Sequence, residues 1–125
     1  MASKFTELIV DAVDPDRLAR FWMAVLGWQA TGKYNGSVEF VGVVEIADPS
    51  GSRPSLVFVP VSEPKALKNR LHLDLNPVGC DQEQEVARLI DLGARRTDVG
   101  QGDSTWVVLA DPEGNEFCIL QPRLD

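Results

Sequence analysis

The sequence of 125 residues has little of several features that define large protein classes. It has one histidine and two cysteines, and no apolar run approaches the roughly 18 residues that a membrane-spanning helix needs. Cys80 and Cys118 are too few for the disulfide framework of a small secreted domain. Residues 1–5 contain no apolar segment of the kind found in secretion signals. We therefore expect free thiols, a cytoplasmic location and no membrane partner.

Several common motifs and an excess of positive charge are also missing. The sequence contains no phosphate-binding loop and no G-x-G-x-x-G, G-x-S-x-G or C-x-x-C motif, which leaves nucleotide-binding, serine-hydrolase and zinc-finger interpretations without support. There are 12 lysines and arginines against 19 acidic residues, a net charge of −7. Such a surface repels phosphate backbones, so no nucleic-acid partner is expected. A hydrophobic content of 44% excludes intrinsic disorder and suffices for a core.

The most informative feature that is present is an internal repeat. The segment Asp48–Gly51 (Asp-Pro-Ser-Gly) recurs as Asp111–Gly114 (Asp-Pro-Glu-Gly), and Leu26-Gly27 recurs as Leu92-Gly93. The offsets, 111 − 48 = 63 and 93 − 27 = 66, both lie close to half of the chain length. Agreement of two markers with that half length predicts a chain built from two copies of one unit.

The first copy begins with a short apolar strand, predicted over residues 5–10. Asp14 then supplies an N-cap, Pro15 suits the first helical position and Asp16 is an acid in the first turn. The apolar residues that follow have the spacing of an amphipathic helix. They are Leu18, Phe21, Trp22, Val25 and Leu26. Gly27 is predicted to end this helix.

The second copy repeats this order. Residues 70–75 alternate leucines on one face with His72 and Asp74 on the other, as a strand does. Asp81 and Gln84 resemble a capping box at the start of a helix. The stripe of that helix consists of Val86, Leu89, Ile90 and Leu92. Gly93 is predicted to end it.

Three short strands are predicted after each helix. They fall at 37–41, 43–47 and 55–61 in the first copy, and at 94–97, 105–110 and 116–121 in the second. The Asp-Pro-x-Gly segments join the last two strands of each copy, because Pro and Gly suit the second and fourth positions of a type I turn. The predicted unit is β-α-β-β-β, made twice over residues of about 1–64 and 69–125, with residues 65–69 as a linker.

This organisation resembles the vicinal oxygen chelate superfamily, the group of glyoxalases, bleomycin-resistance proteins and extradiol dioxygenases. The segments that carry the resemblance are Asp14–Trp28, with Phe21-Trp22 and Leu26-Gly27-Trp28, and Asp111–Phe117, which is similar to the family's DP-x-GN turn. Asn69–Leu75 is similar to the start of the second module in the glyoxalase-like bacterial subgroup. The match covers nearly the whole chain.

The resemblance implies an α+β fold in a single domain of residues 1–125. Two tandem βαβββ modules would form an incomplete barrel around a cleft that binds a small molecule. In this superfamily the cleft is often completed across a dimer, so the resemblance also implies a homodimer. It says little about the reaction, because function lives in the site and not in the fold.

Metal-dependent members of the superfamily take one ligand from the first and one from the last strand of each module. The resemblance places these positions on Glu7 and His72 for the first strands, and on Val57 and Cys118 for the last. Val57 cannot be a ligand, so the set is incomplete. Glu7, His72 and Cys118 with a water suit tetrahedral zinc, and suit iron or manganese less well. The cofactor is therefore expected to be none, or a single zinc, nickel, manganese or iron ion.

Three residues are candidates for proton transfer. His72 has the only side chain whose unperturbed pKa is near neutral, so it is either a proton shuttle or a hydrogen-bonded structural histidine. Glu7 shares a face with Phe5 and Ile9, where apolar neighbours raise a carboxyl pKa and favour a base, unless it is an edge-strand acid in water. Glu116 is a second candidate base, or an exposed acid at the mouth of the cleft.

The remaining candidates would line the ligand site. They are Trp28, Val57, Phe58, Asp74, Trp106 and Cys118. Each tryptophan either supplies a flat wall for a ligand or packs in the core. Cys118 lies between two apolar residues, and a buried free cysteine commonly behaves as a small hydrophobe.

Three hypotheses of function, from different classes, follow from these candidate residues. The leading hypothesis is a glyoxalase/bleomycin-resistance-like protein that binds a small molecule in its cleft without a complete metal site. The alternative is a metal-dependent lyase, isomerase or dioxygenase acting on a substrate with vicinal oxygens, with the metal as Lewis acid. A non-catalytic dimerisation module with a vestigial cleft is the third hypothesis.

Overall fold

The chain folds into two α+β units of the same topology, which confirms the predicted fold class. The computed structural model describes residues 1–97 and 105–122. It divides into unit 1, residues 1–64, and unit 2, residues 65–125, and each is described here by itself. Within the described ranges, neither helix has the length and apolarity needed to cross a bilayer.

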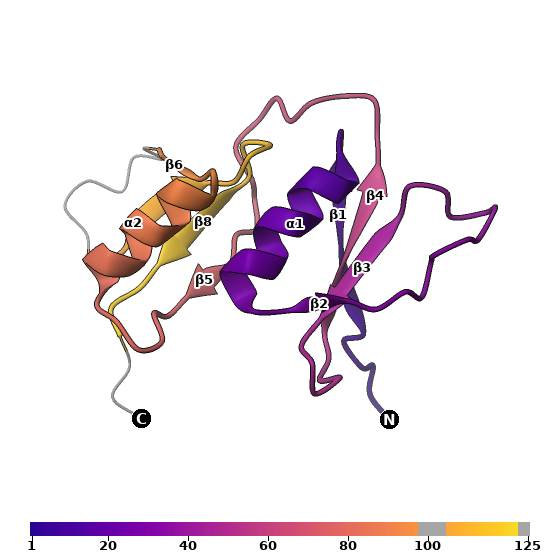
Figure 1. Cartoon of the computed structure of the whole chain (residues 1–125), viewed down its shortest axis with the longest axis horizontal. Coiled ribbons are helices and arrows are strands. Elements are labelled where there is room, and N and C mark those ends of the chain that lie inside the picture. The colour runs from indigo at the N-terminus through magenta and orange to yellow at the C-terminus, as the bar shows by residue number, and fades with distance from the viewer. Residues whose placement is uncertain (98–104, 123–125) are drawn as a thin grey trace. The chain divides into compact units, whose positions relative to one another are not determined.

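Unit 1 is one helix and one four-stranded sheet (Figure 1). In chain order its elements are β1 (Glu7–Ala12), α1 (Pro15–Leu26), β2 (Gln29–Ala30), β3 (Val44–Ala47) and β4 (Ser55–Pro60). The strand order is β1-β4-β3-β2. β1 pairs with β4 in parallel, and the other pairs are antiparallel.

Unit 2 repeats this arrangement with shorter strands. Its elements are β5 (Asp74–Leu75), α2 (Gln82–Leu92), β6 (Arg95–Arg96), β7 (Val107–Ala110) and β8 (Glu116–Ile119). The strand order β5-β8-β7-β6 matches that of unit 1, and β5 is again parallel to β8. The predicted β-α-β-β-β repeat is therefore confirmed in both halves.

Both helices begin and end where the sequence predicts. The Asp14 carboxylate accepts a hydrogen bond from Arg17 N at 3.2 Å, and Pro15 opens α1. Asp81 and Gln84 form a reciprocal capping box on α2. Gly27 and Gly93 end the helices with positive φ angles of 71° and 123°, which a residue with a Cβ adopts only at a cost.

Each unit has its own apolar core between helix and sheet. α1 packs against β1, β3 and β4, and α2 packs against β8. The core side chains with almost no exposed surface include Leu18, Ile46 and Phe58 in unit 1, and Leu89, Leu109, Phe117 and Ile119 in unit 2. Burial of these side chains holds each sheet in place beneath its helix.

The two Asp-Pro-x-Gly segments form the predicted turns between the last two strands of each unit. Gly51 N donates to Asp48 O at 2.8 Å, and Gly114 N donates to Asp111 O at 2.9 Å. The Asp111 side chain is buried and also accepts hydrogen bonds from the backbone of Glu113 and Asn115. The turns fix the register of both hairpins.

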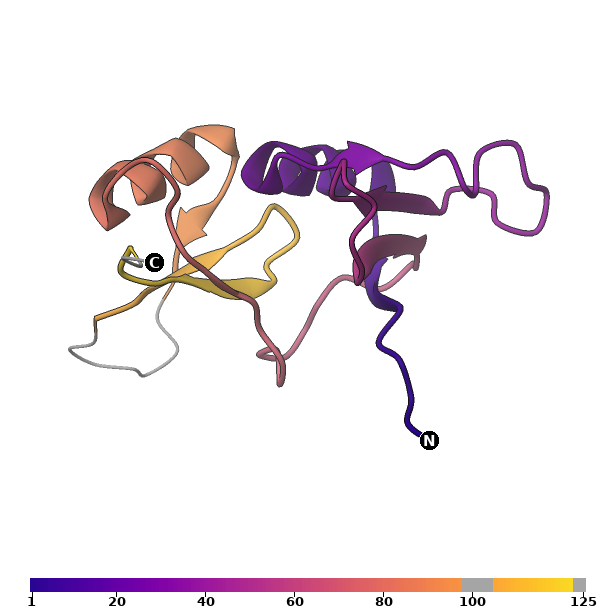
Figure 2. The same cartoon turned by 90° about the horizontal axis from the view of Figure 1, so that it is seen from below.

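The structure corrects two of the predicted strands. Residues 37–41 form turns within an irregular segment between β2 and β3 that extends away from the sheet of unit 1 (Figure 2). Gly36 and Gly42 have φ angles near +80°, which interrupts an extended strand. The strand predicted over 70–75 contains only Asp74 and Leu75, which pair with Cys118 and Ile119 of β8. Leu71 is consequently exposed.

Candidate functional site

The strand registers show which positions of the two units are equivalent. In unit 1, Val57 of β4 faces Glu45 of β3, three residues before the Asp48 turn. In unit 2, Cys118 of β8 faces Val108 of β7, three residues before the Asp111 turn. Val57 and Cys118 therefore occupy the same place in their sheets.

The parallel pairs extend this equivalence to the first strands. Ile9 is the partner of Val57, and Asp74 is the partner of Cys118. Two residues earlier, Glu7 and His72 are then also equivalent. Unit 1 thus has apolar side chains at the two positions where unit 2 has Asp74 and Cys118.

Unit 2 contains a cavity of about 290 Å³ at these positions. Its apolar wall is formed by Trp106, Val108, Leu120 and the thiol-bearing Cys118. Its polar residues are Lys68, His72, Asp74 and Glu116. A cavity with apolar walls and a few polar groups is typical of a site for a small molecule.

Three of these residues form a cluster of metal-ligating groups. One donor atom of each of His72, Asp74 and Cys118 lies within 4.8 Å of the others. His72 Nδ1 is 3.7 Å from Asp74 Oδ1, and both side chains are open to solvent. The Cys118 side chain is buried. Imidazole, carboxylate and thiolate are all zinc ligands, so the donor set fits a tetrahedral ion with one further position.

The Cys118 thiol is a protonated group in the metal-free protein. Burial raises its pKa above the ordinary value, and the negative charge of Asp74 and the hydrogen bond that the thiol donates to it raise the pKa further. Lys68 opposes this effect weakly. Without a cation beside it, Cys118 is therefore a weak nucleophile at neutral pH.

Glu116 is tied to the segment that precedes β5. Its carboxylate accepts a hydrogen bond from Lys65 Nζ at 2.9 Å and from Asn69 N at 3.1 Å. Burial alone would raise the pKa of Glu116, but these two hydrogen bonds and the charge of Lys65 outweigh it and lower the pKa. Glu116 is thus a paired carboxylate and a weak base.

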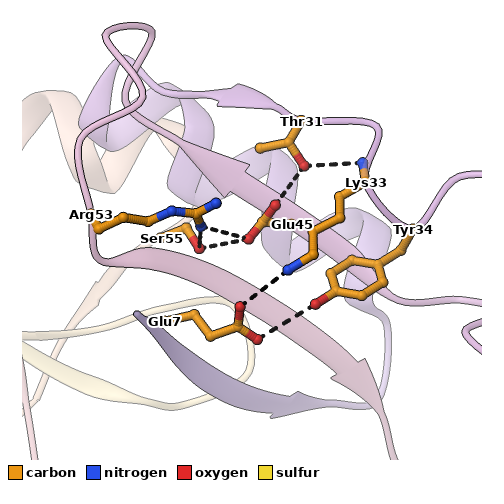
Figure 3. A network of polar contacts seen from close by, with 7 residues as sticks. All are labelled: Glu7, Thr31, Lys33, Tyr34, Glu45, Arg53 and Ser55. Atoms are coloured by element: carbon orange, nitrogen blue, oxygen red, sulfur yellow. Dashed lines mark hydrogen bonds and ion pairs between the residues drawn. The ribbon is translucent and has the colours of Figure 1, made fainter. Parts of the chain in front are cut away.

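Unit 1 has a polar network at the corresponding face of its sheet (Figure 3). The buried Glu45 carboxylate accepts hydrogen bonds from Thr31 Oγ1 at 2.7 Å, Ser55 Oγ at 2.7 Å and Arg53 at 3.0 Å. Burial would raise the pKa of Glu45, but these donors and the charge of Lys33 outweigh it and lower the pKa. The carboxylate is therefore fully occupied by protein groups.

Glu7 lies at the edge of this network and not in an apolar surrounding. Its two oxygens lie 3.4 Å from Lys33 Nζ and 3.5 Å from Tyr34 Oη (Figure 3). Its side chain keeps about a quarter of its surface exposed. The expected apolar neighbours that would make Glu7 a base are thus replaced by a cation and a hydroxyl group.

The predicted site residues separate into two groups. His72, Asp74, Trp106, Glu116 and Cys118 lie together around the cavity of unit 2. The other candidates belong to unit 1. Among them Val57 and Phe58 are fully buried in the core, and Trp28 is half-buried directly after α1.

Sequence reasoning missed three charged residues of these surroundings. Lys65 and Lys68 lie in the segment 65–69, which was expected to be only a linker but belongs to unit 2. Glu45 lies in an otherwise apolar strand, and its partners in the network come from two other segments of the chain, one with Thr31 and one with Arg53 and Ser55. An acid in a strand of buried residues was the one available signal, because a buried carboxylate needs partners.

Solved structures share this fold at low sequence identity. The chain is similar to the fosfomycin resistance protein FosX from Mesorhizobium loti, with a TM-score of 0.68, 14% identity and coverage of 99% of this chain and 95% of that chain. It is similar to a glyoxalase/bleomycin resistance protein/dioxygenase family enzyme from Burkholderia phytofirmans, with a TM-score of 0.63, 17% identity and coverage of 94% and 97%.

A third similar structure holds a metal ion. It is a variant of FosX from Listeria monocytogenes in complex with Mn(II) and 1S,2S-dihydroxypropylphosphonic acid, with a TM-score of 0.71, 11% identity and coverage of 99% and 96%. No match was found among curated protein sequences. The model of the glyoxalase-like domain matches residues 7–120, which is nearly the whole chain. The protein therefore belongs to the glyoxalase-like domain family, within the glyoxalase/bleomycin resistance/dioxygenase superfamily.

Proposed function

We propose that this protein binds a small, mainly apolar molecule in the cavity of unit 2. The observation that carries the proposal is the cavity itself, which is lined by the apolar Trp106, Val108 and Leu120 together with polar residues such as His72 and Asp74. An apolar wall supplies affinity through burial, and a few fixed polar groups supply orientation. Membership of a family whose relatives bind small molecules supports the same function.

The charges of the site favour binding over acid–base catalysis. Glu116 is neutralised by Lys65, and its lowered pKa makes it a weak base. Glu7 is engaged by Lys33 and Tyr34 of its own unit. His72 remains as the side chain suited to move a proton at the cavity, through a ring nitrogen. One such group is sufficient to recognise a ligand, whereas most acid–base mechanisms use both an acid and a base.

A metal-dependent lyase, isomerase or dioxygenase is the second candidate. The cluster of His72, Asp74 and Cys118 favours it, because these side chains bring three different metal-ligating groups to the cavity wall. A bound divalent ion would supply Lewis acidity to oxygens of a substrate. Trp106 and Leu120 would then orient that substrate and exclude water from it.

Ligand binding is tested by a thermal-shift screen of small molecules, followed by calorimetric measurement of Kd. At 100 times its Kd a ligand stabilises the folded protein by about 2.7 kcal/mol, which raises the Tm measurably. We expect Trp106→Ala to weaken binding by at least about tenfold, because it removes the largest apolar wall. Trp28→Ala is the matched control, since Trp28 lies in unit 1 and outside the cavity.

Two results would count against the proposal. The first is a broad screen in which no compound raises the Tm of the wild-type protein. The second is an equal loss of affinity in the Trp106→Ala and Trp28→Ala variants, which would mean that the ligand does not occupy the cavity of unit 2. Both variants are compared at a temperature where circular dichroism shows them folded.

The assembly and location of the protein are part of this proposal. We propose a homodimer, in which the two units of each chain form one domain, and a cytoplasmic location that suits the free thiols of Cys80 and Cys118. The mass measured by analytical ultracentrifugation tests the dimer. A monomer at micromolar concentration would contradict it.

A further inference from the structure

We propose that unit 2 by itself binds a zinc ion through His72, Asp74 and Cys118, with the fourth coordination position open to the cavity. This inference deepens the proposed function and rests on it for the identity of the cavity as the ligand site. It differs from a ligand set shared by both units, because Asp74 takes the place of a donor from unit 1. The site would then be complete within residues 65–125.

The backbone of unit 2 brings the three donors together. His72 and Asp74 are two residues apart along an extended segment, so their side chains lie on the same side. Asp74 is the register partner of Cys118 in the parallel pair of β5 and β8. The hydrogen bond from Cys118 N to Leu73 O, at 2.9 Å, fixes this register at the residue between His72 and Asp74.

The spacing of the donors is close to that of a metal site. The three atoms lie within 4.8 Å of one another, and the imidazole and carboxylate are 3.7 Å apart. Ligand bonds to zinc are about 2.0–2.3 Å long, which places tetrahedral ligands somewhat closer together. His72 and Asp74 are exposed, so small rotations of these two side chains close the remaining gap. Cys118 stays on its strand as the fixed ligand.

The chemistry of the donors selects the ion. One thiolate, one imidazole and one carboxylate form a mixed set that zinc accepts, whereas magnesium and manganese prefer oxygen ligands. Binding of the ion displaces the thiol proton to solvent, so the thiolate and the Asp74 carboxylate together balance the charge of one divalent cation. Lys68 is the lysine at the cavity, and its positive charge, which would repel a cation, is exposed to solvent.

The same positions in unit 1 do not form such a site. Ile9 and Val57 stand where unit 2 has Asp74 and Cys118, and Glu7 is bonded to Lys33 and Tyr34. Unit 1 is therefore an internal control with the same backbone and no donor cluster. Any metal that the chain holds through a thiolate at this face must be held by unit 2.

Cobalt(II) titration of the full-length, chelator-treated protein tests the inference without any organic ligand. We expect one ion per chain and the near-ultraviolet charge-transfer band of a thiolate–cobalt bond, both displaced by zinc. Cys118→Ser should abolish the band and Cys80→Ser should preserve it. His72→Ala and Asp74→Asn, at exposed positions that the core does not need, should each weaken zinc binding by at least about tenfold. Glu7→Gln should leave zinc affinity unchanged.

Three outcomes would overturn the inference. The first is the absence of a charge-transfer band in the wild-type protein, and the second is a band that survives Cys118→Ser. The third is a loss of zinc affinity in Glu7→Gln as large as that in Asp74→Asn, which would indicate a ligand set shared by both units. These outcomes are distinct from failure of the proposed function. Binding of cobalt without binding of any compound in the thermal-shift screen would support the zinc site and contradict the ligand cavity. Binding of a compound without binding of cobalt would support the ligand cavity and contradict the zinc site.

Discussion

In unit 1 the position opposite Val57 is Glu45, whose carboxylate is buried and bonded to Thr31, Ser55 and Arg53. In unit 2 the equivalent position is Val108, and the polar groups stand instead at His72, Asp74 and Cys118. One backbone topology thus carries two different arrangements of polar side chains on the same face of its sheet.

The difference shows that the burial of a polar group does not decide whether the group is available to a ligand. The Glu45 network uses its hydrogen bonds within the protein and so contributes to the stability of unit 1. The donors of unit 2 line a cavity, where two of the three are open to solvent. We therefore expect substitutions in the Glu45 network to affect folding, and substitutions in the donor cluster to affect binding.

The largest effect on stability is expected for Glu45→Ala. The variant leaves the hydroxyl groups of Thr31 and Ser55 and the Arg53 guanidinium without their shared acceptor. We expect a loss of about 2–4 kcal/mol in the free energy of unfolding, measured by urea titration. Glu7→Ala is the matched control in the same unit, and its partly exposed ion pair should cost less than about 1 kcal/mol.

Equal costs for these two variants would remove the distinction between a buried network and a surface pair. A large loss of cobalt binding in Glu45→Ala, at a temperature where it is folded, would likewise show that the two units are not separate in function.

A smaller contrast is expected at the two helix ends. Gly27 has φ 71° and ψ 27°, which is the left-handed helical region, whereas Gly93 has φ 123° and ψ 1°, outside it. Gly27→Ala should cost about 1 kcal/mol and Gly93→Ala about 2–3 kcal/mol, because a Cβ is less tolerated at the second conformation. Thermal unfolding of both variants measures this difference. Equal Tm values would contradict it.

A small effect that depends on pH is expected for Glu116→Gln. The folded protein lowers the pKa of Glu116 below 4.5, so its charge stabilises the fold above the unfolded value. This contribution is lost as the pH falls through the lowered folded value. We expect the variant to lose about 1 kcal/mol at pH 7 and to approach wild-type stability in acid. Urea titrations at several pH values measure the gap, and a gap independent of pH would contradict the role of the charge.

The sequence predicted the parts of the fold that depend on local signals. Asp14, Gly27 and the Asp81–Gln84 pair define helix ends through contacts within a few residues, and all were confirmed. The short strands were less predictable, because a strand exists only where a partner strand is present. Residues 70–75 do alternate, yet only Asp74 and Leu75 of this segment pair with β8.

The candidate site was predictable to the same limited degree. Two-residue spacing identified His72 and Asp74 on one side, and the resemblance to the family placed Cys118 on the last strand, with Val57 as its counterpart in unit 1. The register that places Asp74 beside Cys118 is a long-range property, so only the structure shows their proximity. The third donor expected from the resemblance was Glu7. The role of Lys65 depends on a contact with Glu116 that joins the two ends of unit 2.

The parallel pairing of first and last strands has a consequence for synthesis of the chain. β1 needs β4, so the sheet of unit 1 cannot be completed before residues 55–60 have left the ribosome. Contacts of such long sequence separation form slowly, because the intervening chain must first be ordered. Once they have formed, unit 1 holds all of its strands before β5 to β8 have left the ribosome. Folding of the nascent protein can therefore proceed in two successive stages, one for each repeat.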